Sequence, residues 1–317
     1  MDTVSTSVTP VRSTDALQRA IDQTNAIILG KDQQIRLCLA CLLAKGHLLI
    51  EDIPGVGKTT LAHALARNLG LSFQRIQFTS DLLPADIIGA AVYHRESGDF
   101  RFHSGPIFAQ LILADEINRA TPKTQSALLE AMEEHQVTVE GETRRLPEPF
   151  FVIATQNPNY QVGTFPLPES QLDRFLMRVE LGYPDKDAEH ELLLGQDRRS
   201  MLEQMEPALT NDELLHMQLQ VDAIKVTDAL VNYVQKIVTY TRENPDFESG
   251  LSPRASLAIK RGAQAWALME GRNATIPEDV QAVLPGVVTH RVKMKNEVSA
   301  KSASQLAARL IEDVDIP

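Results

Sequence analysis

The chain has 317 residues, a length that favours two domains. Its residues are 43% hydrophobic and 23% charged, a composition that excludes a disordered polymer and favours a folded globular protein. Forty-two acidic and 31 basic residues give a net charge of -11, which disfavours nucleic acid as the main partner because phosphate backbones are negative. The N-terminus lacks the pattern of a secretion signal, and no apolar run approaches the ~20 residues of a membrane helix. We therefore expect a cytoplasmic protein without a membrane span.

An apolar helix is predicted over residues 35–43, and it contains both cysteines, Cys38 and Cys41. The C-x-x-C spacing can indicate a redox dithiol or half of a zinc site, but no second pair of cysteines accompanies it. Free cysteine is among the most buried residue types. We expect both thiols to pack in the core.

Five short apolar runs predict β-strands, and helical patterns separate most of them. Alternating strands and helices are typical of a parallel sheet covered on both faces. The first domain, residues 1–185, is therefore expected to be an α/β domain with a five-stranded parallel sheet. The strands are predicted at residues 47–51, 73–78, 111–115, 150–155 and 176–181.

Two segments, residues 91–104 and 136–146, interrupt this alternation. Each alternates apolar and polar residues around a glycine-containing turn, which predicts a β-hairpin. The pattern is compatible both with surface decoration and with moving elements that grip a partner.

Helical patterns dominate from residue 186 to residue 317, which predicts an all-α lid domain. One amphipathic stripe runs over residues 230–238. A second helix is expected to begin at Pro253, capped by Ser252, and to extend to about residue 270. Shorter helices are predicted from Pro277 and over residues 303–311.

A phosphate-binding loop is predicted directly after the first strand, where the sequence DIPGVGKTT leads into a helix. Glycines let successive backbone N–H groups point at a phosphate, and the helix N-terminus adds a favourable dipole. Lys58 is expected to reach the β- and γ-phosphate oxygens and the Thr59 hydroxyl to ligate Mg²⁺; an ordinary glycine turn is the alternative. The usual first glycine of the motif is an aspartate here. The loop residues expected to bind the nucleotide are Asp52, Ile53, Pro54, Gly55, Val56, Gly57, Lys58, Thr59 and Thr60.

Polar residues follow two of the later predicted strands, and carboxyl ends of parallel strands form the edge at which ligands bind. Asp115 is expected to hold Mg²⁺ through water, and Glu116 to orient and polarise the attacking water. Asn157 could hydrogen-bond the γ-phosphate or that water. The alternatives are a solvated acidic pair and a turn formed by Asn157 and Pro158.

Two arginines are candidates for transition-state or nucleotide contacts. Arg174 precedes the fifth strand and could be an arginine finger lent to a neighbouring subunit, or could form a structural ion pair with Asp173 or another neighbour. Arg254 lies in the first turn of a helix, where a cation opposes the macrodipole unless an anion is nearby. We expect that anion to be the γ-phosphate of the bound nucleotide; a solvent-exposed arginine is the alternative.

The segments EDIPGVGKTT, LILADEINRA, ATQNP, LDRF and LSPRAS occur in the order of an AAA+ ATPase. Together with residues 125–133 and 168–175, they resemble the MoxR family over nearly the whole chain, from about residue 28 to residue 294. The resemblance implies a ring, hexameric or smaller, with ATP between subunits and Arg174 reaching the neighbour's nucleotide. It also implies that Ile28 and Gly30 lie in the segment lining the adenine pocket.

The resemblance further implies that both hairpins mark the clade shared with magnesium chelatase motor subunits and replicative helicases. MoxR proteins resemble chaperones, many of which act with a von Willebrand factor type A domain partner to mature protein complexes or insert metal into them. A DNA-translocating motor is the main alternative, prompted by Arg144 and Arg145, although few aromatic residues lie near basic ones. Two others are a magnesium-chelatase-type motor subunit and a scaffold that binds ATP without turnover. The sequence assigns no role to Arg119.

Overall fold

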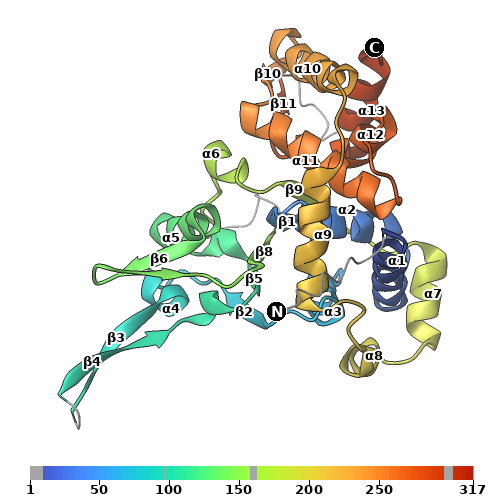
Figure 1. Ribbon diagram of the computed structural model, residues 1–317. Coiled ribbons are helices and arrows are strands. Elements are labelled where there is room, and N and C mark those ends of the chain that lie inside the picture. Colours follow the sequence, from blue (N-terminus) through green and yellow to red (C-terminus); the bar gives the residue numbers. More distant parts are fainter. Residues whose placement is uncertain (1–9, 96–97, 158–162, 296–302, 317) are drawn as a thin grey trace, which may run out of the picture.

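The predicted strands form one parallel sheet, in the order β2-β5-β8-β1-β9, in a computed structural model of the protein (Figure 1). The structure describes residues 10–95, 98–157, 163–295 and 303–316. The strands are β1 (Leu48–Glu51), β2 (Phe73–Gln77), β5 (Leu111–Asp115), β8 (Phe151–Gln156) and β9 (Met177–Val179). The sequence prediction of a five-stranded parallel sheet is therefore confirmed, with small differences at the strand ends.

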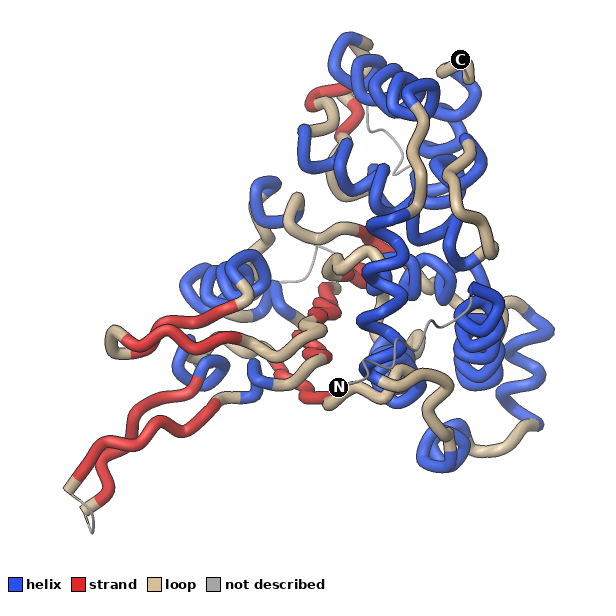
Figure 2. The backbone as a smooth tube through the Cα atoms, viewed as in Figure 1, coloured by secondary structure: helices blue, strands red, loops and turns tan. Residues whose placement is uncertain are grey.

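Helices cover both faces of this sheet because successive strand residues point to opposite sides. Leu48, Leu111 and Leu113 pack into one core, while Leu49 and Ile112 pack into another. The helices α1 (Pro10–Ile27), α2 (Asp32–Leu43) and α3 (Lys58–Asn68) contribute to the first core. The helices α4 (Pro84–Ile88) and α5 (Pro122–Glu134) contribute to the second, as do the short helices η1 (Pro106–Phe108) and η2 (Ile117–Arg119). Figure 2 shows helices on both sides of the sheet.

Both predicted hairpins are present and extend away from the sheet (Figure 1). The first pairs β3 (Gly89–His94) with β4 (Asp99–Ser104), and the second pairs β6 (Gln136–Val139) with β7 (Glu142–Arg145). The tight second turn uses left-handed backbone at Glu140 (φ 53°) and Gly141 (φ 83°), which suits a two-residue hairpin turn. The Arg144 guanidinium lies over the Phe102 ring, 4.1 Å from its centroid, and thereby connects the two hairpins.

The described part of the C-terminal half is mainly helical, as predicted, and it also contains a short antiparallel pair of strands, β10 (Phe247–Ser249) and β11 (Lys293–Met294). Ser252 caps the predicted second lid helix by accepting a hydrogen bond from the backbone N–H of Ala255. The strands β10 and β11 are too short to produce an alternating pattern in the sequence. Helix α6 (Glu169–Leu172) still belongs to the α/β half, because it precedes β9. The helices that follow this half are α7 (Lys186–Leu194), α8 (Arg198–Gln204), α9 (Asn211–Ala223), α10 (Asp228–Glu243), α11 (Pro253–Met269), α12 (Pro277–Val288) and α13 (Ala303–Asp313).

One apolar core continues from the sheet into the lid. It includes residues of α2, α3, β9, α11 and α12. Gly262 of α11 allows a close approach to the sheet, because a Cβ atom there would lie only 2.9 Å from Cε of Met177 in β9. The start of α7 at Lys186 agrees with the predicted domain boundary, but the boundary itself stays a prediction because the core runs across it.

Both cysteines are buried and free in α2, in agreement with the core-packing prediction. Burial raises the pKa of the Cys38 thiol to about 12, which keeps it in its unreactive protonated form. Within the described ranges, no three histidine, cysteine or acidic residues are grouped so that they could hold a metal ion. None of the described helices is both long and apolar enough to cross a membrane.

His47, which directly precedes β1, predicts a pH dependence of stability. Its Nδ1 accepts a hydrogen bond from the Val152 N–H, which leaves Nε2 as the donor to the Met132 carbonyl. Burial lowers the pKa of His47 from 6.5 to about 4, so only the unfolded chain takes up this proton between those values. The free energy of unfolding should therefore fall as the pH decreases from 6.5 to 4, by roughly 3 kcal/mol from this residue.

Urea unfolding measured across this pH range tests the prediction in the wild type and in His47→Gln, which has no titrating ring. The variant should lose less stability on acidification than the wild type. The exposed His190→Gln variant is the control and should retain the wild-type pH dependence. Identical slopes for the wild type and His47→Gln would contradict the assignment to His47.

Candidate functional site

The glycine-containing loop lies between the carboxyl end of β1 and the start of α3. Gly55 (φ 88°) and Gly57 (φ 94°) both adopt left-handed backbone, which glycine tolerates without strain. Gly57 is the residue before α3, and no side chain caps the first N–H groups of this helix. These N–H groups are therefore available to bind an anion, and phosphate binding by the loop stays a prediction.

Lys58 is buried at the start of α3, with 8% of the residue exposed. Its Nζ donates to the carbonyl oxygens of Asp52 (2.5 Å) and Ile53 (3.3 Å) and to Oδ1 of Asn157 (3.1 Å). Burial lowers the pKa of Lys58, whereas nearby carboxylates, Asp52 first and then Asp115, oppose that shift. The ammonium is therefore held between the loop and the residue that follows β8.

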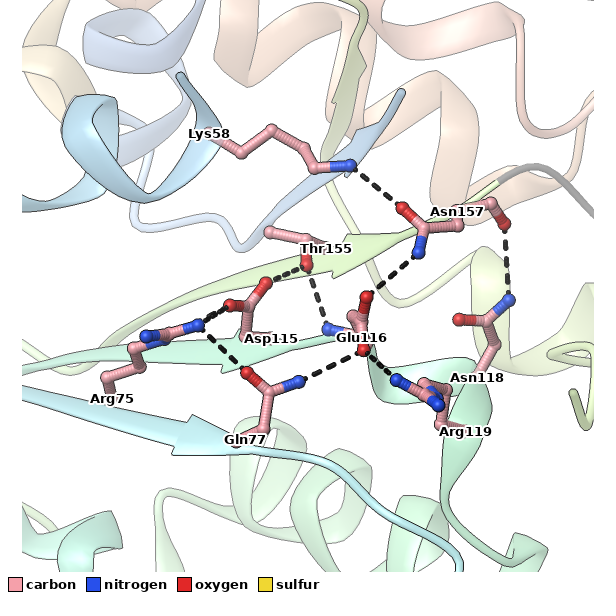
Figure 3. A network of polar contacts seen from close by, with 9 residues as sticks. All are labelled: Lys58, Arg75, Gln77, Asp115, Glu116, Asn118, Arg119, Thr155 and Asn157. Carbon is pink, nitrogen blue, oxygen red and sulfur yellow. Dashed lines mark hydrogen bonds and ion pairs between the residues drawn. The ribbon is translucent and has the colours of Figure 1, made fainter. Parts of the chain in front are cut away.

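Asn157 joins Lys58 to Glu116 because of the strand order. Strand β8 lies between β1 and β5, so its end lies between the residues that follow those strands. The Asn157 side chain accepts from Lys58 through Oδ1 and donates through Nδ2 to Oε1 of Glu116, at 2.9 Å (Figure 3). The structure thus brings together three of the predicted catalytic residues in one continuous chain of hydrogen bonds; Pro158 lies outside the described residues.

Glu116 has left-handed backbone (φ 55°), a costly conformation for a residue with a Cβ atom. Its N–H donates to the Thr155 hydroxyl at 2.9 Å. Its Oε2 accepts from Arg119 (2.7 Å) and Gln77 (3.1 Å). The carboxylate is therefore fixed from both sides, which gives Arg119 an orienting role that the sequence left open (Figure 3).

Asp115 is buried at the end of β5, and both of its oxygens have partners. Oδ1 accepts from the Thr155 hydroxyl at 2.6 Å, and Oδ2 accepts from Arg75 at 2.5 and 3.0 Å. A carboxylate and the hydroxyl of Thr59 are hard oxygen donors of the type that Mg²⁺ prefers. Two protein oxygens suit a metal that is held mainly by substrate phosphates and water, so the predicted pair fits Mg²⁺.

The remaining predicted nucleotide residues surround the loop. Ile28 packs over it, since a Cβ atom on Gly57 would lie 3.8 Å from Cδ1 of Ile28. Thr59 and Thr60 line a cavity of about 870 Å³ between α3 and α8. Among the described residues, the Asp52 carboxylate accepts hydrogen bonds only from backbone N–H groups, and its predicted contact with a nucleotide stays a prediction.

Arg254 lies beside Glu133 rather than at the phosphate loop of its own chain, and its contact with the γ-phosphate of a bound nucleotide stays a prediction. Its guanidinium bonds Glu133 at 2.7 Å, and Arg174 bonds the same carboxylate at 2.9 Å. These three residues line a small recess with His47, which precedes β1, whereas the phosphate loop follows β1. The four-residue strand β1 separates His47 from the start of the phosphate loop by ~13 Å, because His47 precedes the strand and the loop follows it. In this chain, Glu133 is an anion that can offset the unfavourable helix dipole at Arg254.

Sequence reasoning missed Arg75, Gln77 and Thr155. Arg75 and Gln77 alternate with buried Ile76 along β2, so both lie on the same side of that strand. Strand β2 pairs with β5 and sets Gln77 opposite Asp115. For Arg75 and Gln77, the signal in the sequence was a pair of polar residues near the end of a predicted strand. Only the pairing of β2 with β5 shows that they reach Asp115 and Glu116.

Comparisons with known proteins agree with this geometry. Residues 47–177 match the ATPase family associated with various cellular activities (AAA), and residues 239–310 match the AAA lid domain. The chain is 44% identical over 303 residues to YeaC of Bacillus subtilis, with 95% of each chain covered. It is 42% identical over 312 residues to the chaperone MoxR1 of Mycobacterium tuberculosis, covering 95% of this chain and 82% of that relative.

A crystal structure of a protein from Cytophaga hutchinsonii, described as a candidate ATPase, has the same fold. It matches with a TM-score of 0.86 and 34% identity, and 97% of each chain is covered. The fold, the site and these relatives together show that the chain belongs to the MoxR family of AAA+ ATPases.

Proposed function

We propose that this protein hydrolyses ATP with Mg²⁺ between the subunits of a ring, and uses the reaction to remodel a protein client. The observation that carries the proposal is the hydrogen-bonded chain from Lys58 through Asn157 to Glu116 at the carboxyl edge of the sheet. The Lys58 ammonium, which can bind phosphate oxygens, and the Glu116 carboxylate, which can bind water, both contact the Asn157 side-chain amide.

Each residue of the proposed site has its own part in the reaction. Backbone N–H groups of the loop and Lys58 bind the phosphates and stabilise negative charge that develops on them. Glu116 accepts a hydrogen bond from the attacking water and polarises it. Asn157 is held by both neighbours, so it can position that water or the γ-phosphate. When bound, Mg²⁺ would be held by Thr59 and, through water, by Asp115, and it would neutralise charge on the phosphate oxygens.

Arg174 and Arg254 serve a neighbouring subunit's nucleotide in this proposal. Both guanidinium groups bond Glu133, at the edge opposite their own phosphate loop. In a closed head-to-tail ring, each subunit presents one face to the opposite face of the next. The pair would then approach the neighbour's triphosphate, where two cations stabilise the charge of the transferring phosphoryl group.

Protein remodelling is proposed rather than DNA translocation. A relative at 42% identity is named a chaperone. Arg144, half of the basic pair that prompted the DNA alternative, is engaged by Phe102 and Glu142. The hexameric ring, the cytoplasmic location and the partner with a von Willebrand factor type A domain remain predictions from the sequence and its resemblance.

The proposed function makes a prediction about Glu116. Glu116→Gln keeps the size of the side chain but removes the negative charge that polarises water, so hydrolysis should fall by at least ~100-fold, while ATP binding persists. Phosphate release and retention of radiolabelled ATP measure the two effects. The exposed Glu130→Gln variant is the control and should hydrolyse ATP normally. Undiminished turnover in Glu116→Gln would remove the role assigned to Glu116.

The second prediction tests whether Arg174 acts across a subunit boundary. Lys58→Ala and Arg174→Ala should each be nearly inactive alone, because one loses phosphate binding and the other the neighbour's cation. An equal mixture should recover activity, since random assembly gives about a quarter of interfaces an intact Lys58 facing an intact Arg174. ATPase rates of mixed, reassembled protein measure this.

The control mixture combines Lys58→Ala with the double variant Lys58→Ala/Arg174→Ala, in which no interface can be complete. It should stay inactive. An inactive mixture of the two single variants, with assembly confirmed by light scattering, would show that each subunit must supply both residues itself.

The third prediction concerns the partner. A protein with a von Willebrand factor type A domain encoded beside this chain should co-purify with it when ATP is present and with Glu116→Gln, which retains ATP. It should not co-purify with Lys58→Ala, which lacks the phosphate contact. Association that is indifferent to nucleotide would argue against a motor acting with that partner.

A further inference from the structure

Asp52 occupies the position at which the general phosphate-loop motif has its first glycine. It stands just beyond the end of β1, whose last pairing with β9 joins Ile50 to Val179. In the same register, Asp52 lies opposite Leu181, where regular pairing between the two strands has ended. The backbone N–H groups that follow β9 at this point therefore have no partner in β1.

The Asp52 carboxylate binds those groups. Oδ2 accepts from the N–H groups of Leu181 and Gly182, at 2.6 Å each, and Oδ1 accepts from the N–H of Ile53 at 2.8 Å. Asp52 is 9% exposed and Leu181 only 2%, so water competes poorly for these bonds. The carboxylate therefore joins the first turn of the phosphate loop to the segment that follows β9.

That segment, residues 181–185, lies against the predicted adenine-pocket residues. Lys31 Nζ donates to the carbonyl oxygen of Tyr183 at 2.8 Å. A Cβ atom on Gly30 would lie 3.2 Å from Oδ2 of Asp185, whose other oxygen caps α7 at the N–H of Ala188. Residues 28–31 and 181–185 thus form one wall, here called the base-side wall.

We propose that Asp52 is a positioning residue that fixes the phosphate loop relative to the base-side wall, so that one nucleotide can contact both. The inference rests on the proposed ATP site and deepens it. Two binding surfaces held at the right separation favour a ligand that touches both, because the protein loses less conformational entropy when that ligand binds. A ligand that touches the loop alone gains nothing from the fixed separation.

Comparing ADP with pyrophosphate, each with Mg²⁺, isolates this role. ADP reaches both surfaces, whereas pyrophosphate reaches only the phosphate loop. Asp52→Asn keeps the side-chain size but turns one acceptor into a donor that faces backbone N–H groups. It should weaken ADP binding about tenfold or more, the loss expected for a charged hydrogen bond, and leave pyrophosphate binding within about twofold. Calorimetry on the assembled protein measures both affinities.

Asp52→Gly provides the second variant, and it introduces the residue that the general motif carries at this position, so the loop can still form. It should show the same selective loss of ADP affinity, with thermal unfolding confirming that it is folded. Equal loss for ADP and pyrophosphate would overturn the inference, because Asp52 would then shape the loop alone. Unchanged ADP affinity would also overturn it. A wild type that binds neither ligand would instead remove the proposed function, and this inference with it.

Discussion

The buried ammonium of Lys58 sets the requirements that the surrounding site meets. A cation removed from water must be surrounded by acceptors, and two loop carbonyls, one side-chain amide and nearby carboxylates fulfil that need. These groups follow β1, β5 and β8, which are adjacent in the sheet and end at one edge. The parallel arrangement therefore provides the charge balance, and the strand order decides that Asn157 stands between Lys58 and Glu116.

Much of this arrangement could be predicted because its parts are local. The phosphate loop, the strand before it and the helix after it are contiguous, and glycine at positions 55 and 57 is required by left-handed backbone. Asp115 and Glu116 follow a run of four apolar residues, which reveals a buried strand. The hairpins could be found because alternation around a glycine turn needs no knowledge of distant residues.

The remainder depends on contacts between distant parts of the chain. Arg75 reaches Asp115 only because β2 pairs with β5, and no spacing in the sequence encodes that pairing. The sequence predicted that Arg254 needs an anion, but it did not reveal Glu133, which lies far from Arg254 in sequence and next to it in space. In the sequence, Asp52 is a departure from the phosphate-loop motif. Only the structure shows that its carboxylate accepts a hydrogen bond from the N–H of Leu181, which lies 129 residues away in sequence.

The contact between Gly262 and Met177 limits how the lid can respond to nucleotide. Because α11 approaches β9 so closely and shares a core with α2, tilting the lid alone would expose apolar surface, at about 25 cal/mol for each Å². A rotation of the lid together with the sheet avoids that penalty. In the proposed ring, a subunit would then turn as one rigid body, and its two projecting hairpins would move farthest.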